Sequence, residues 1–453
     1  MSLDNLKHLS PGLNDDAGDQ TAETIINIDT GDADDNGLPI DTSDAPEADL
    51  AEAQEETAAA VEAQDVAEES AETNEGLDKV EEALEAIYKE RRGPTAMEAK
   101  LIDDLANGAT RRLYAAATVE QRLGGTYGGG LNSMAGATHE DVAAGLNEVR
   151  ENKTSGFKAF IQKVLEFFKG IGKAITKFLS GSAKLKGRAE ELKKRATSAK
   201  ASSKNGNVTV SGSGALYHAG GNANVANVSQ GTKNLVDTSS RILKDGTLYK
   251  AACVRSLDLL RKSITESDEM AKLYDVIVKN ATKDFQKMGT NSRSSMQLIG
   301  GLQVGVIAKA EEYKLTAFAT QTNMTETDSW PILSSSDCGT LAGIAVELTE
   351  IAMSYQDGWK ERDRGRAEWE KEAKKVADQA KDGYGKSTDD GFFKKFTTKR
   401  KIASSVGSTL MSVTGVENRL VGHNLKVAKA LCSYVDASLK ELNKEEKDKK
   451  DKK

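Results

Sequence analysis

The stretch that decides the fold is FKAFIQKVLEFFKGIGKAITKFL, residues 157–179. Its apolar side chains recur at the three- and four-residue spacing of one helix face, and its lysines fall mostly off that face. The pattern predicts a basic amphipathic helix in which Glu166 is the single acidic residue. The apolar face consists of Phe157, Phe160, Ile161, Val164, Phe168, Ile171, Ile175 and Phe178.

Two interpretations fit this amphipathic helix. In the first, it is a core helix whose apolar face packs against other helices of a basic protein body. In the second, the aromatic side chains enter the acyl boundary of a membrane while the lysines meet anionic head groups, or the face docks on a partner helix. The spacing is the same in both cases, so it does not decide between them.

A more basic stretch, residues 182–204, follows the amphipathic helix. It contains no aromatic residue and no base-recognition motif, so its cations suit phosphate neutralisation without base readout. A solvated helix face would have the same composition. The candidate phosphate contacts are Lys184, Lys186, Arg188, Lys193, Lys194 and Arg195.

The charge of the chain is divided unevenly along its length. Residues 1–72 carry 21 acidic side chains and one lysine, a net charge of −20, and the other 381 residues carry +12, which together give −8. We find no periodic apolar face in this acidic arm, and we therefore expect it to be disordered. A transient helix over residues 50–72 is the alternative. The asymmetry indicates a nucleic-acid or membrane partner for the basic remainder.

The helical period returns beyond the acidic arm. Leu77, Val80, Leu84 and Ile87 predict a helix that ends near the sequence RRGP at 91–94, and a second helix is expected over 95–114. Residues 302–322 fit either a strand pair or a helix.

We therefore predict a mainly α fold, a helical bundle with a disordered acidic N-terminal arm and a small β insertion. The expected segments are the propeptide-like arm 1–72, a helical segment 73–204, a β-rich insertion 205–235, a C-terminal helical domain 236–440 and a charged tail 441–453.

Chemistry-bearing motifs are scarce in this sequence. The four histidines and three cysteines show no metal-ligand, disulfide or catalytic-triad spacing, and no phosphate-loop, G-x-S-x-G, H-E-x-x-H or C-x-x-C motif occurs. The sequence thus predicts no metal, no cofactor and no enzymatic activity. The alternative in the enzyme class is a hydrolase of unfamiliar type in the C-terminal half. The sequence also shows no secretory signal and no apolar run long enough for a transmembrane helix.

Short tripeptides that end in glutamate, with a small residue two positions earlier, recur in the acidic arm. Ser70-Ala71-Glu72 is the best placed of them, and Ala67-Glu68-Glu69 is the second choice. An unfolded arm with such sites is accessible to a protease.

The order of features resembles the internal head proteins, or prohead core proteins, of large tailed phages, especially the jumbo myoviruses. The resemblance rests on the acidic arm, on EEALEAIYKERRGPTAMEAKLIDDLANG (81–108), on the amphipathic stretch 157–179, and on KLKGRAEELKKRA (184–196). It implies a structural protein of the capsid interior, made in the host cytoplasm during assembly.

The resemblance also implies the partners of the chain. They are capsid and prohead core proteins, a prohead protease that cuts after glutamate at Glu72 or Glu69, and packaged double-stranded DNA contacted without sequence specificity. Some family members leave the head with the genome. The alternative in a different class is a membrane-interacting protein that is delivered into the host cell during infection.

Overall fold

The structure is a computed structural model that describes most of the chain beyond the N-terminal 44 residues. The described residues are 45–115, 136–199, 205–217, 224–261, 295–309, 314–322, 329–383 and 390–450, with the single residues 279 and 283.

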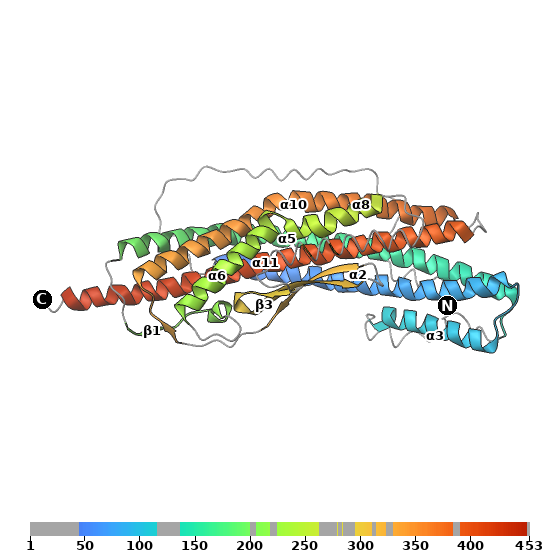
Figure 1. Cartoon of the computed structure of the whole chain (residues 1–453), viewed down its shortest axis with the longest axis horizontal. Helices are drawn as coiled ribbons and strands as arrows, with labels where there is room; N and C mark the ends of the chain where they lie inside the picture. The colour runs from blue at the N-terminus through green and yellow to red at the C-terminus, as the bar shows by residue number, and fades with distance from the viewer. Residues whose placement is uncertain are drawn as a thin grey trace.

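Four long helices lie side by side and form an elongated bundle (Figure 1). They are α2 (Ala45–Lys89), α5 (His139–Ser198), α10 (Ser335–Gly383) and α11 (Asp390–Lys450). The contacts along their lengths show that α5 and α11 run in one direction and that α2 and α10 run in the other. The predicted helical bundle is therefore confirmed.

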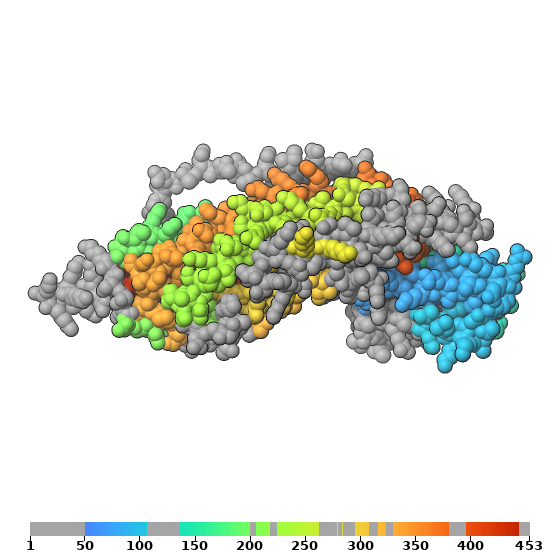
Figure 2. Space-filling model, in the orientation of Figure 1, coloured from blue at the N-terminus to red at the C-terminus, as the bar shows by residue number. Residues whose placement is uncertain are grey.

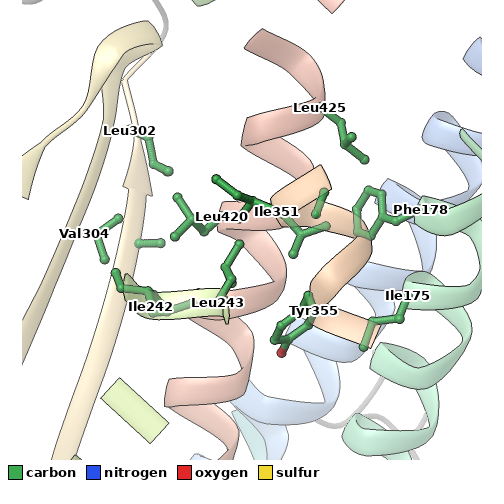
Figure 3. Close-up of a cluster of buried hydrophobic side chains, with 14 of the residues drawn as sticks. Ile175, Phe178, Ile242, Leu243, Leu302, Val304, Ile351, Tyr355, Leu420 and Leu425 are labelled. Atoms are coloured by element: carbon green, nitrogen blue, oxygen red, sulfur yellow. The ribbon is translucent and has the colours of Figure 1, made fainter. Parts of the chain in front are cut away.

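Helix α5 lies at the centre of the bundle because one stripe of its side chains is apolar over its whole length. Its buried residues recur every three or four positions from Val142 to Ala196, the spacing that keeps a seam facing neighbouring helices. Figure 3 shows Ile175 and Phe178 of this stripe beside Ile351 of α10 and Leu420 of α11. The helix begins with a capping box formed by Thr138 and Asp141.

One end of the bundle is a three-helix corner with a core of its own. Helix α3 (Ala96–Ala115) folds back beside α2, and the ends of α2, α3 and α5 share a small apolar cluster. The turn passes so close to the start of α5 that a Cβ on Gly93 would lie 2.1 Å from the Ala137 carbonyl oxygen. Only glycine, which has no Cβ, fits at position 93.

The predicted corner helices are confirmed. In α3, the large apolar side chains of Met97 and Leu101 are 84% and 54% exposed. The cluster instead takes Ala99, Ile102 and Ala106 from α3, because these residues face α2.

A layer of short helices covers α10 and α11 on one side. It comprises α6 (Val225–Ser239), the π-helical turn η2 (Ser240–Lys244), α7 (Thr247–Tyr249), the π-helical turn η3 (Lys250–Val254) and α8 (Arg255–Arg261). Ile242 and Leu243 of η2 are fully buried, which holds this layer on the bundle.

The small β insertion is an antiparallel meander of β2 (Ser295–Gln297), β3 (Leu302–Lys309) and β4 (Lys314–Gln321), in which Val304 pairs with Ala319. Leu302, Val304 and Val306 alternate inward along β3. The outer edge of β4 rests on α11, where the Ser412 hydroxyl accepts from the Ala317 amide at 3.2 Å. The strand-pair alternative for residues 302–322 is thus the correct one.

Two sequence-based expectations on β structure and disorder are wrong. The stretch 205–235 contains the two-residue strand β1 (Asn207–Val208), which pairs with β5 (Trp330–Pro331), and the 3₁₀ turn η1 (Ser213–Leu216), but Val225 begins a helix. The Asn224 side chain caps that helix by accepting from the Asn227 amide at 2.9 Å. Disorder is wrong from Ala45 onward, because residues 45–72 belong to α2, whereas residues 1–44 lie outside the described residues.

The core packing around α5 gives a direct test of the bundle. Phe160 is fully buried, and its ring stands edge-on to Trp369 with centroids 6.0 Å apart. We expect Phe160→Ala to lower the free energy of unfolding by about 3–5 kcal/mol in urea denaturation followed by circular dichroism, because it removes a large core side chain. Lys158→Ala, on the exposed side of the same helix, should change it by less than about 0.5 kcal/mol. Equal effects of the two variants would contradict the assignment of this face to the core.

Candidate functional site: the charged helix pair

The most unusual feature of the bundle is the pairing of an acidic helix with a basic one. Helix α2 carries 15 acidic and two basic side chains, and α5 carries 13 basic and seven acidic ones. The two helices are antiparallel neighbours that share the most extensive contact in the chain. The acidic region of the sequence therefore lies on the basic helix rather than apart from it.

The first half of α2 packs through alanines. Ala53, Ala60 and Ala67 recur every seven residues and are almost completely buried. They allow a close approach, since a Cβ on Gly170 of α5 would lie 3.1 Å from the Ala60 Cβ. Because an alanine buries little apolar area, this seam contributes less per residue than a seam of leucines.

Exposed ion pairs flank the alanine seam. The Lys177 ammonium lies 2.6 Å from the Glu52 carboxylate, and the Lys173 ammonium lies 3.4 Å from the Glu56 carboxylate. All four side chains are at least 32% exposed, and such pairs typically contribute about 0–1 kcal/mol. They set the register of the helices and neutralise two lysines of α5, but they do not hold the helices tightly.

The second half of α2 packs through larger side chains and a buried ionic cluster. The cluster centres on Asp78, whose carboxylate receives two hydrogen bonds from the Arg400 guanidinium of α11, at 2.5 and 2.6 Å, and an ion pair from Lys153 of α5 at 2.5 Å. These three residues are between 1% and 3% exposed. The cluster joins three helices at one level of the bundle.

The electrostatics of the cluster favour a charged Asp78. Burial alone would raise the pKa of the Asp78 carboxyl, but the positive charges of Arg400, Lys153 and Lys401 outweigh burial and lower it. Lys153 also pairs with Glu81, and Arg150 donates to Glu81 at 2.7 Å. Cations and carboxylates therefore alternate, and each buried charge has a partner of opposite sign.

The predicted cleavage residues lie at the boundary between the two halves of α2. Ala67 is buried in the alanine seam, Ser70 is half-buried with its hydroxyl bonded to the Val66 carbonyl at 2.9 Å, and Glu72 is exposed. The residues Thr73 and Asn74, which follow Glu72, are buried. In the folded chain this site is helical, so a protease that needs an extended strand requires local unfolding of α2.

The predicted phosphate contacts lie on the last third of α5, which forms part of the surface near one end of the molecule (Figure 2). Lys184, Arg188, Lys193 and Lys194 are exposed. Lys186 pairs with Glu350 at 2.9 Å, and Arg195 pairs with Asp436 at 3.0 Å. The structure thus places the six cations along one helix, where Lys186 and Arg195 pair with acidic residues of α10 and α11.

The apolar face of the amphipathic helix is inside the bundle. All eight residues predicted for this face are at most 5% exposed, and the Phe168 ring packs against Trp359 with centroids 6.1 Å apart. In the folded chain this face contacts protein, which is the first of the two sequence interpretations. Within the described residues we find no helix with the length and apolarity that crossing a membrane requires.

A second buried ionic group lies between α10 and α11. The Arg362 guanidinium donates two hydrogen bonds to the Glu417 carboxylate, at 2.9 and 2.8 Å, and the Tyr355 hydroxyl donates to the same carboxylate at 3.1 Å. Burial raises the pKa of Tyr355 well above its usual value. Glu417 is fully buried and accepts all three of these hydrogen bonds, so it is a buried anion that ties α10 to α11. Among the described residues, no cluster of three or more His, Cys, Asp or Glu side chains is arranged to hold a metal ion.

Sequence reasoning missed both the alanine seam and the Asp78 cluster. The seam has a signal in the sequence, an alanine at every seventh position from Ala53 to Ala67, which is hidden among many glutamates. The cluster has no local signal, because Asp78 and Arg400 are 322 residues apart in the chain.

Comparison with known proteins identifies one family. The sequence model of the phiKZ-like phage internal head proteins matches residues 47–437. The match therefore includes nearly all of α2, all of α5 and α10, and most of α11. No curated protein and no solved structure matches the chain.

The Asp78 cluster predicts a pH-dependent contribution to stability. Asp78→Asn leaves Arg400 without its anion, so we expect a loss of about 3–5 kcal/mol of unfolding free energy at pH 7. A carboxyl with a lowered pKa stabilises the fold above its unfolded pKa and loses this effect as the pH falls, so acidification to pH 3 should narrow the gap between unaltered protein and variant.

Urea denaturation at pH 7, 5 and 3 measures this gap. Glu148→Gln, an exposed carboxylate of α5, serves as the control and should change stability by less than about 0.5 kcal/mol. A gap that stays constant from pH 7 to pH 3 would show that the Asp78 ion pairs do not carry the effect.

Proposed function

The chain belongs to the phiKZ-like phage internal head proteins, and we propose that it serves inside the head as a structural protein that contacts packaged DNA and is shortened during maturation. The observation that carries this proposal is the charged helix pair, in which the acidic half of α2 covers part of the basic α5. A protein built in this way changes the sign of its net charge if the acidic part is removed.

The proposed DNA contact is made by the exposed cations at the C-terminal end of α5. Leu185, Ala189 and Leu192 are buried, which fixes the outward direction of Arg188, Lys193 and Lys194. A row of cations on a rigid helix neutralises phosphates and releases counterions without reading the base sequence. This contact suits a protein that meets packaged DNA of any sequence.

The acidic half of α2 opposes that contact in two ways. Its carboxylates pair with Lys173 and Lys177 of α5, so these lysines are partly neutralised. Residues 1–72 also carry a net charge of −20, which repels DNA phosphates. We infer that full DNA contact follows removal of the arm.

The proposed cut after Glu72 coincides with a change in how α2 is held. Residues before it are attached by alanines, exposed ion pairs and the hydrogen bond from Asn418 to Thr57. Leu77, Val80 and the Asp78 cluster hold the residues after it. A cut at this point would release the weakly held half and leave the anchored half in place. The partners implied are a prohead protease and the neighbouring capsid and core proteins.

DNA binding by the full chain tests the proposed surface. We expect Arg188→Gln, Lys193→Gln and Lys194→Gln combined to weaken binding to a 40-base-pair duplex. The slope of log K against log salt should become shallower by about 0.9 for each phosphate that the variant no longer neutralises. Fluorescence anisotropy at several salt concentrations measures both quantities.

A matched control removes the same charge elsewhere. Lys360→Gln, Lys371→Gln and Lys375→Gln combined take three exposed cations from α10, where acidic residues are frequent. This variant should bind the duplex nearly as well as the unaltered chain. If the two triple variants weaken DNA binding equally, the binding depends on net charge alone, and the proposed surface is contradicted.

Processing is tested on mature particles. Mass spectrometry of purified phage should recover peptides from residue 73 onward, with a new N-terminus at Thr73 or, for the second site, at Ser70. Peptides from residues 1–69 should be absent. Recovery of the intact arm in mature particles would refute the processing step without affecting the proposed DNA-binding surface.

A further inference from the structure

A small pocket lies where the acidic helix, α11 and the sheet meet. It is open to the surface, has a volume of about 290 Å³ and is lined by residues of α2, α5, β3, β4 and α11. Figure 3 shows this region, with Leu302 of β3 on one side of α11 and Phe178 of α5 on the other. Its lining residues are Gln54, Thr57, Phe178, Leu302, Ala319, Gln321, Asn418, Arg419, Gly422, His423 and Lys426.

The charge in this pocket is entirely positive. Arg419 and Lys426 lie seven residues apart on α11, so they share one face of the helix, and no carboxylate is among the lining residues. Helix α2 is rich in acids, yet it presents the neutral Gln54 and Thr57 here. Elsewhere along α2, glutamates pair with lysines of α5. In the pocket, by contrast, α2 supplies no carboxylate to the cations of α11.

The pocket also offers hydrogen-bond acceptors. Asn418 is fully buried and donates to the Thr57 hydroxyl at 2.8 Å, but its Oδ1 has no partner among the described residues. His423 Nε2 lies 2.7 Å from the Ile299 carbonyl oxygen, and because a carbonyl only accepts, this nitrogen carries the proton. Burial lowers the pKa of His423 to about 4, so the ring is neutral at pH 7 and Nδ1 is an acceptor.

The remaining wall is apolar. Phe178 of α5, together with Leu302 and Ala319 of the sheet, supplies the apolar part of the lining on the two sides of α11. A bare oxyanion would leave this wall and the Asn418 oxygen without contacts. A ligand that matches all three features has an anionic group, a flat apolar body and N–H or O–H donors.

We propose that this pocket binds a terminal nucleotide unit, a nucleoside monophosphate, with its phosphate on Arg419 and Lys426. The nucleobase lies on the apolar wall, and its amino group or a sugar hydroxyl donates to Asn418. The unit has two sources, a free nucleotide or the 5′-phosphorylated end of a DNA strand, and both present the same chemistry.

Calorimetric titration of the full-length chain with dAMP tests the pocket. We expect saturable binding that Lys426→Gln and Arg419→Gln each weaken by about tenfold or more, since each removes a charge-assisted hydrogen bond to phosphate. Lys426 is exposed, and its substitution should leave the melting temperature unchanged, which separates weaker binding from impaired folding. Lys371→Gln, which removes an exposed cation of α10 outside the pocket, is the matched control and should bind dAMP normally.

Three further titrations define the ligand. Deoxyadenosine and inorganic phosphate should each bind at least tenfold more weakly than dAMP. Competition by a 5′-phosphorylated dodecamer would support the pocket as a strand-end site, and failure of that competition alongside dAMP binding would support it as a free-nucleotide site. No saturable binding of dAMP, equal binding of phosphate alone, or an equal effect of Lys371→Gln would overturn the proposal.

Discussion

The antiparallel contact between α2 and α5 is the constraint on which the rest of the structure depends. Helix α5 carries a buried, mostly apolar stripe from Val142 to Ala196, and a stripe of that length needs partners along its whole extent. Helices α10 and α11 cover two sides of it, and α2 covers the third. Because α2 is strongly acidic, the packing of α2 on α5 also pairs glutamates of α2 with lysines of α5.

The two halves of α2 are held by different physics, and the proposed function follows from that difference. Small side chains allow close packing but bury little area, so the half up to Glu72 is attached weakly. Larger residues and the Asp78 cluster anchor the half beyond it, because removing a single partner from a buried ion pair leaves an uncompensated charge. The residues of α2 that pack in the corner with α3 all lie beyond the proposed cut.

The sequence was sufficient for the parts of the fold that have a strong local period. The three- and four-residue spacing from Phe157 to Phe178 predicted a face that is buried, and Leu77 to Ile87 predicted the corner helix. The order of acidic arm, corner helices and basic amphipathic helix also indicated the family. Prediction from the sequence failed where tertiary contacts override composition. Ala53 and Ala60 lie in a segment with the composition of a solvated tail, yet both are buried in the core of the bundle. It failed also at Val225, because a β-branched residue in a Gly- and Asn-rich context suggested a strand where the Asn224 cap begins a helix.

Hydrogen–deuterium exchange of the full-length chain tests the central claim, that α2 is one helix docked on α5 with two different strengths. The account predicts that amides of residues 50–70 are protected relative to an unfolded chain, and that they exchange much faster than amides of residues 77–87. Exchange of residues 50–70 at the unprotected rate would contradict the docking of the acidic half on α5. Equal protection of both segments would contradict the difference in strength on which the proposed processing rests.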